Sequence, residues 1–211
     1  MKIMKKLLSV TLVAFSCFCA FAQPSAGTVS LQPKVGMNVS RITDDNAAKN
    51  RIGFTGGLEL GYQVNRKFAM TGAIMYSMQG AKVKGSDATV KLDYINIPIL
   101  ANVYVVKGLA LKAGIQPAFN VSKRLSAGGV SMDFDEAYKL GSGRNGKVNS
   151  FDLSVPMGLS YEISGMVFDA RYNLGVTKIM GGFAKNDVRP DSRNSVFQFT
   201  IGYKFALGGR K

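Results

Sequence analysis

The chain has 211 residues and a formal net charge of +14, with 27 lysine and arginine against 13 aspartate and glutamate residues, and it contains no histidine. The absence of histidine removes the usual general base, the usual partner of a serine nucleophile and the commonest transition-metal ligand. Hydrolytic enzymes built on Ser-His or Asp-His pairs are therefore excluded, and the sequence predicts a protein with no enzymatic activity and no cofactor.

The first 22 residues have the pattern of a cleavable signal peptide. Three lysines among the first six residues precede an apolar run over 7–21, and a small-x-small sequence at 20–22 is typical of a cleavage site. A membrane anchor is the alternative, but the run is short for a spanning helix. We therefore expect a signal peptide at 1–22 and one exported domain at 23–211. Both cysteines lie in the leader, so this domain has no disulfide and no thiolate chemistry.

Apolar and polar residues alternate along most of the remaining chain. In the last stretch, Phe197, Phe199 and Ile201 alternate with polar or small residues. A period of two indicates a β-strand with one apolar and one polar face. No apolar stretch after the leader is long enough for a transmembrane helix. The alternation predicts about eight strands, at 29–40, 53–64, 68–81, 92–105, 109–122, 151–161, 166–176 and 195–205.

The fourth of these stretches, 92–105, departs from strict alternation. Leu92 and Tyr94 have one parity, whereas Ile95 and the apolar residues that follow it have the other. A one-residue slip moves every side chain to the opposite face of a sheet. We therefore expect a β-bulge near 94–98, where Pro98 has no N–H to donate to a ladder.

The connections between the predicted strands are alternately short and long. Tight turns are expected at 65–67, 106–108 and 163–165, and long polar loops at 41–52, 82–91, 123–148 and 178–194. Short periplasmic turns, long extracellular loops and an even strand count are typical of bacterial outer-membrane barrels. The sequence thus predicts an all-β fold: a transmembrane antiparallel up-and-down β-barrel of about eight strands, located in the outer membrane.

The volume of the side chains indicates which face of this barrel points outward. A soluble barrel such as a lipocalin has the same period with its bulky face inward. The interior of an eight-stranded barrel is just wide enough for side chains to fill. Five or six bulky apolar residues from nearly every strand would overfill it, whereas the opposite face is rich in glycine and serine. We therefore expect the apolar face to contact lipid, with aromatic residues near the strand ends as interfacial girdles.

The polar face carries four acidic and four basic residues, and we expect them in the lumen. A charge left unpaired in a narrow, dry lumen costs several kcal/mol, so these side chains are expected to pair. The favoured interpretation is a salt-bridged plug that stiffens the barrel, and the alternative is a selectivity constriction. The predicted lumen charges are Lys34, Glu59, Lys112, Asp152, Glu162, Asp169, Arg171 and Lys204.

The excess of basic residues falls on the loops, turns and tail. Basic loops at a membrane surface attract anionic headgroups or phosphorylated surface glycolipid, and this is the expected lipid partner. The export signal argues against nucleic acid as a partner, and a solvated surface is the simplest interpretation. The loop residues concerned include Arg41, Lys49, Arg51, Lys82, Lys84, Lys123, Arg124, Arg144, Lys147, Lys185, Arg189 and Arg193.

Two motif-like segments lie in the longest loop. A GxGxxG string at 141–146 lacks the strand before it and the helix after it that dinucleotide binding requires, so we interpret it as a flexible segment. Asp133, Asp135 and Glu136 could bind calcium weakly, but their spacing is not that of an EF-hand. A solvated acidic cluster is the favoured reading, and no metal site is predicted.

Four segments resemble the PorT-like outer-membrane β-barrel family, whose members are often labelled "porin family". They are the sequence KLDYINIPIL at 91–100, GIQP at 114–117, DARYNLG at 169–175 and the closing strand at 197–205. The resemblance implies a small eight-stranded barrel without catalytic residues, and it implies secretion or envelope proteins as possible partners. We therefore expect a non-enzymatic barrel with a structural or interaction role. A narrow porin-like channel for small solutes or ions is the alternative.

Overall fold

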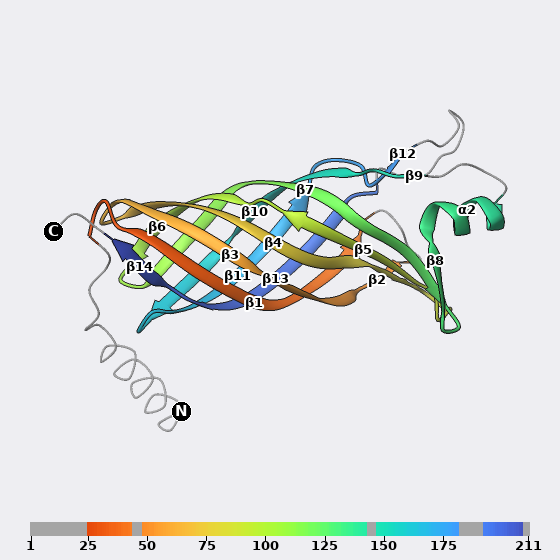
Figure 1. The fold of residues 1–211 in the computed structure, drawn as a ribbon, viewed down its shortest axis with the longest axis horizontal. Coiled ribbons are helices and arrows are strands. Elements are labelled where there is room, and N and C mark those ends of the chain that lie inside the picture. Colours follow the sequence, from red (N-terminus) through yellow and green to blue (C-terminus); the bar gives the residue numbers. More distant parts are fainter. Residues whose placement is uncertain (1–24, 44–47, 143–146, 182–191, 209–211) are drawn as a thin grey trace, which may run out of the picture.

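A computed structural model of the chain describes residues 25–43, 48–142, 147–181 and 192–208. The predicted signal peptide lies outside these residues. Within them the chain folds into an antiparallel barrel whose tilted strands wind around one long axis (Figure 1). The strands that form the wall are β1 (Val29–Ile42), β3 (Arg51–Asn65), β4 (Phe68–Val83), β5 (Thr89–Asn96), β6 (Ile99–Val106), β7 (Leu109–Ala127), β10 (Phe151–Ile163), β11 (Met166–Gly175) and β13 (Asn194–Tyr203).

The wall closes because β1 pairs with β13 as well as with β3. The closing register runs from Lys34 opposite Gly202 to Ile42 opposite Asn194. Strands β5 and β6 together occupy one position in the wall, between β4 and β7. The described residues therefore form a ring of eight strands. The short strand β14 (Phe205–Gly208) continues beyond β13 and pairs with the start of β1. The predicted all-β, up-and-down barrel of about eight strands is thereby confirmed.

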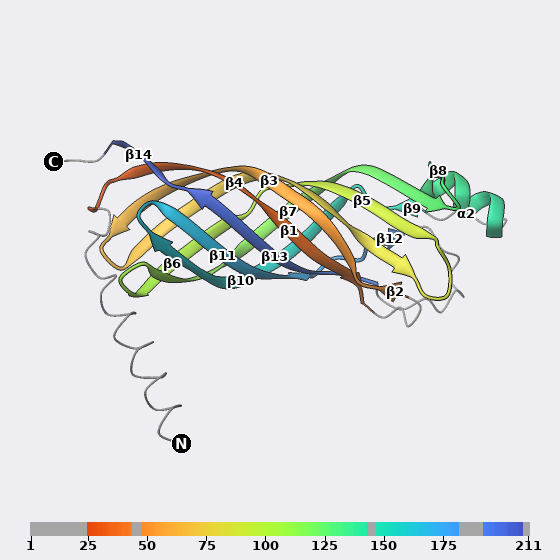
Figure 2. The same ribbon diagram turned by 90° about the horizontal axis from the view of Figure 1, so that it is seen from below.

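The two ends of the barrel differ, as the lengths of the connections predict. The tight turns, β14 and the start of β1 lie at one end, and the larger connections lie at the other (Figure 2). The turn between β10 and β11 has positive φ at Ser164 (52°) and Gly165 (81°), as a two-residue type I′ hairpin requires. The large connections contain β2 (Ala48–Lys49), β8 (Val130–Asp133), α2 (Phe134–Ser142), β9 (Lys147–Val148) and β12 (Met180–Gly181). No described helix combines the length and the apolar character needed to cross a membrane.

Several strands continue beyond their predicted ends at the large-loop end. Strand β4 reaches Val83 and β5 already begins at Thr89, while β7 extends to Ala127 and turns back into β8. The predicted long loop at 123–148 therefore contains a hairpin and a helix. Alternation did not reveal the hairpin because its residues 127–133 are all exposed, and a ribbon with water on both faces has no reason to alternate.

The fourth strand has no bulge at 94–98, so that prediction is wrong. Its register against β4 runs without a shift from Thr89 to Val103, and Leu92 and Tyr94 are fully buried inside the barrel. The change of parity in the sequence marks apolar side chains that point inward. An irregularity does lie nearby, between Asp93 and Tyr94, but the extra residue is Val121 of β7. Pro98 interrupts the ladder only because it has no N–H.

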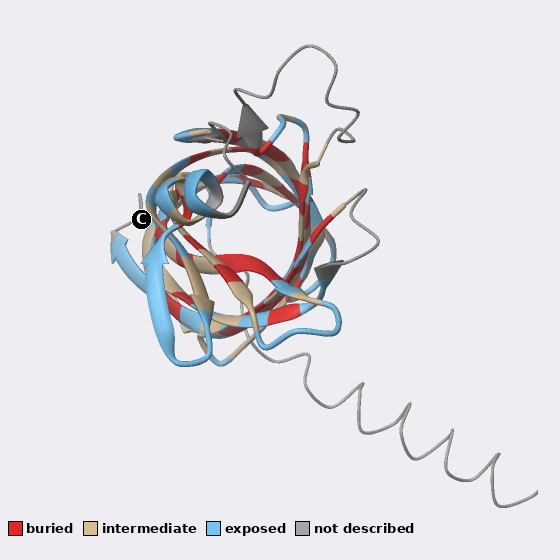
Figure 3. Cartoon of the chain, turned by 90° about the vertical axis from the view of Figure 1, so that its right-hand side faces the viewer, coloured by how far each residue is buried: buried red, intermediate tan, exposed pale blue. Residues whose placement is uncertain are grey.

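The bulky apolar residues point outward, which confirms the predicted face assignment. Leu58 is 55% exposed, Ile74 is 63% exposed and Phe54 is 51% exposed, although all three lie within long strands of the wall. The inward residues are mostly polar and buried, so each strand alternates between buried and exposed positions around the ring (Figure 3). An apolar band around a polar interior is the arrangement of a transmembrane barrel.

Candidate functional site

The lumen is the candidate site, because it collects the polar faces of all the wall strands. Each of the eight predicted charges lies on the inner side or at the mouth of the barrel. The structure separates them into three groups: five form a central cluster, two form a pair at the short-turn mouth, and Asp152 lies alone toward the large-loop end.

Four charges of the central cluster form a closed ring across the lumen. Lys34 Nζ lies 2.8 Å from Glu59 Oε2 and 3.5 Å from Asp169 Oδ2. Lys112 Nζ lies 3.6 Å from Glu59 Oε1 and 2.6 Å from the same Asp169 Oδ2. Strands β1 and β3 supply one side of this ring, and β7 and β11 supply the other. Charge alternates around it, and every side chain is at most 4% exposed, so we call these four residues the charge ring.

Arg171, two residues after Asp169 on β11, adds a third cation to the charge ring. Its Nε lies 2.7 Å from Asp169 Oδ1, close enough for an ion pair but off the line of an ideal hydrogen bond. The aliphatic part of Arg171 packs directly against Gly158 of β10. A side chain at that position would collide with it, since a Cβ on Gly158 would lie 2.8 Å from Arg171 Cγ. The central cluster of five thus contains three cations and two carboxylates.

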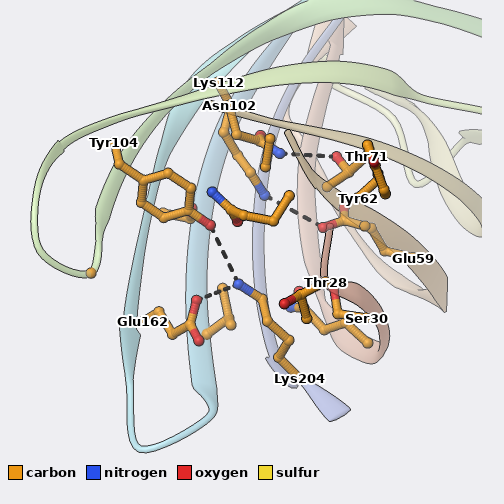
Figure 4. A pocket seen from close by; sticks show the side chains of 17 residues that line it. Thr28, Ser30, Glu59, Tyr62, Thr71, Asn102, Tyr104, Lys112, Glu162 and Lys204 are labelled. Carbon is orange, nitrogen blue, oxygen red and sulfur yellow. Dashed lines mark hydrogen bonds and ion pairs between the residues drawn. The ribbon is translucent and has the colours of Figure 1, made fainter. Parts of the chain in front are cut away.

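Lys204 and Glu162 form an ion pair at the short-turn mouth (Figure 4). Tyr104 Oη accepts a hydrogen bond of 3.5 Å from Lys204 Nζ. Behind this pair a pocket reaches as far as Glu59 and Lys112, where the charge ring closes it. Its volume of about 30 Å³ holds about two water molecules, so it is too small for an organic ligand.

Asp152 ties together the two ends of the last large connection. It accepts hydrogen bonds from Asn194 Nδ2, at 2.7 Å, and from the hydroxyl of Thr177. Asn194 Nδ2 also donates to Tyr94 Oη at 3.4 Å. The predicted charge therefore serves as a hydrogen-bond acceptor for neutral partners and lies outside the charge ring.

A buried apolar layer lies inside the barrel toward the large-loop end, where Tyr94 is joined to Asp152 through Asn194, and the sequence reading missed it. Leu92 and Tyr94 of β5 contribute to it from the wall, and Phe134 contributes from helix α2. We call this layer the apolar plug: Ile42, Ala81, Val90, Leu92, Tyr94, Ala118, Phe134, Val148 and Ile179.

Arg51 is a further buried cation, which the sequence reading assigned to a loop. It is buried at the start of β3 and donates from Nη1 to the carbonyl oxygen of Gln79. Its odd parity matches Thr55 and Glu59, so extending the predicted strand by two residues would have revealed it. Buried amides complete the polar lining: Gln32, Asn38, Gln63, Gln79, Asn96, Asn102, Gln116, Asn173, Asn194 and Gln198.

The acidic residues of the longest connection have structural partners in the described part of the chain. Asp133 accepts from the backbone N–H of Asp135 as a helix cap, while Asp135 pairs with Lys123 and accepts from the N–H of Val148. Among the described residues, no group of three or more potential metal ligands is found. Residues 143–146 of the GxGxxG string lie outside the described part.

Similarity to one solved structure, the neisserial surface protein A, supports the barrel fold. The neisserial surface protein NspA is 15% identical and aligns with a TM-score of 0.52 over 84% of this chain and 97% of its own. Ail of Yersinia pestis is 18% identical, with a TM-score of 0.48 over 85% and 99% of the two chains. OprG of Pseudomonas aeruginosa is 17% identical, with a TM-score of 0.48 over 89% and 100%.

No curated protein sequence matches the chain significantly. A family model, described as the outer membrane protein beta-barrel domain, matches residues 21–181. That span contains most of the wall and its alternating connections, from β1 to β11. Apolar residues facing outward, a polar lumen and a closed ring of eight strands agree with this match. The chain is thus an outer-membrane protein, and it belongs to the outer membrane protein beta-barrel domain family.

Proposed function

We propose that this protein is a non-enzymatic barrel with a blocked lumen, and that it acts through the loops it presents at the cell surface. The charge ring, which crosses the lumen with all four side chains at most 4% exposed, carries this proposal. The apolar plug supports it, because ions would have to cross a second, apolar layer. Within the family we propose that the chain is a PorT-like member whose residues 1–22 are removed as a signal peptide.

Conductance of the refolded protein in a planar bilayer tests the blocked lumen. The expected result is a folded barrel, recognised by its heat-modifiable gel mobility, that shows no steady openings. Lys112→Met would serve as the lumen variant and Lys107→Met, in a tight turn, as its control. Steady wild-type openings whose ion selectivity changes in Lys112→Met but not in Lys107→Met would replace this proposal by the narrow-channel alternative.

We further propose that the large-loop end binds anionic surface glycolipid. Arg41, Lys49, Lys82 and Lys84 are exposed there, where the large connections meet the outer leaflet. Positive charge near such a surface is attracted by phosphate groups, at about 1 kcal/mol per side chain. Binding of a phosphorylated glycolipid to the folded barrel should weaken in Lys82→Glu/Lys84→Glu. Equal binding of a dephosphorylated glycolipid would contradict an electrostatic origin.

A further inference from the structure

The charge balance of the central cluster leaves one cation over. Lys34 and Lys112 balance Glu59 and Asp169 within the charge ring. Arg171 then adds a positive charge with no carboxylate of its own, since it shares Asp169 with both lysines. An unbalanced charge in a site closed to solvent is strongly disfavoured.

The remaining lumen carboxylates are too far away to compensate it. Arg171 lies opposite Gly158 of β10, and on that strand Glu162 is four residues away and Asp152 six residues away. At about 3.3 Å per residue these separations are roughly 13 and 20 Å. Both carboxylates also have their own partners, Lys204 and Asn194 respectively.

The guanidinium of Arg171 has donors to spare. Its side chain is fully buried, and neither Nη1 nor Nη2 contacts a hydrogen-bond acceptor among the described residues. A guanidinium presents its N–H groups as a planar fork that suits an anion. The pocket at the short-turn mouth does not include Arg171, because the charge ring lies between them.

We propose that Arg171 holds a small monovalent anion, of the size and charge of chloride, inside the barrel. One negative charge neutralises the cluster of three cations and two carboxylates, and Nη1 and Nη2 supply its hydrogen bonds. The neighbours of Arg171 limit the size of the anion: Asp169 of the charge ring contacts its Nε, and Gln198, its register partner on β13, accepts a hydrogen bond of 3.3 Å from Asn173. The anion is thus a structural component of the lumen.

Stability in chloride at constant ionic strength tests the proposal. The urea midpoint of the detergent-folded barrel is measured while sodium chloride replaces sodium gluconate, whose anion is too bulky for the site. The midpoint of the wild type should rise with chloride and, above the dissociation constant, increase in proportion to the logarithm of the chloride concentration, as it does for a ligand that binds one site of the folded state. Arg171→Met, which keeps the stem and removes the donors and the charge, should abolish the rise. Lys204→Met, which removes a lumen cation outside the cluster, should keep it.

Crystals of the wild-type protein grown with sodium bromide give an independent readout that does not depend on a variant folding. An anomalous peak beside Arg171, between the charge ring and Gln198, is expected. A wild-type midpoint that ignores chloride, a rise that survives in Arg171→Met, or ordered crystals without a bromide peak at this place would each overturn the proposal.

Discussion

Asp169 is the carboxylate on which the lumen charges converge. Its Oδ2 lies 2.6 Å from Lys112 and 3.5 Å from Lys34, its Oδ1 lies 2.7 Å from Arg171, and its side chain has no exposed area. Asp169→Asn keeps the shape and removes the charge, so three cations would face Glu59 alone. Breaking a buried ion pair by removing one partner costs about 3–5 kcal/mol. We expect a loss of this size in the free energy of unfolding.

A urea titration of the barrel folded in lipid vesicles measures this loss at fixed salt. Because the chain has no tryptophan, unfolding is followed by circular dichroism and gel mobility. Glu162→Gln is the matched control, since it removes the same charge from a pair with Lys204 whose side chains are 16–21% exposed. Pairs of this kind contribute about 0–1 kcal/mol. If Asp169→Asn were no less stable than Glu162→Gln, the charge ring could not be a dry, tightly coupled unit.

The remaining predictions concern the wall and the plug. Leu58→Arg places a charge among the lipid tails at the level of the charge ring and should cost about 2–4 kcal/mol in the same titration, whereas Val130→Arg, exposed on the β7–β8 hairpin, should cost little. Gly158→Ala should cost about 1–3 kcal/mol, because its Cβ would lie 2.2 Å from a carbonyl oxygen of β11. Gly72→Ala meets no atom within 4 Å and should be tolerated; equal losses at the two glycines would refute the steric argument. Phe134→Ala should speed hydrogen exchange in α2 while the wall strands keep their protection, and unchanged exchange in α2 would show that Phe134 does not anchor the helix.

The sequence predicted the wall well because lipid outside and a polar lumen inside impose alternation on every strand. The same reasoning explains where it failed. Leu92 and Tyr94 point inward although they are apolar, since they belong to the apolar plug and not to the lipid face. A rule that equates apolar with outward must then interpret two inward residues as a slip of register, although the register against β4 is unbroken.

The lumen charges could be named from parity, but their partners could not. Lys112 and Glu59 are far apart in the chain, and their approach depends on which strands face each other across the closed ring. Asp152 faces the lumen and is a carboxylate, like Glu59 and Asp169. It nevertheless binds amide and hydroxyl groups, because it lies nearer the large-loop end than the charge ring does. Arg51 was missed for a simpler reason: the predicted strand began at residue 53, two residues later than β3 does.

The seam between β1 and β13 has a consequence for assembly. Its register joins Lys34 to Gly202, so the hydrogen bonds that complete the cylinder link the first and the last wall strand in chain order. Contacts of such long sequence separation form slowly, and until they form, two strand edges present unpaired amides. Each unpaired amide in hydrocarbon is energetically costly, so a half-closed sheet is unstable in the membrane. Insertion into the membrane and closure of the barrel must therefore be nearly simultaneous. Once β1 has paired with β13, the barrel should open only on very long timescales.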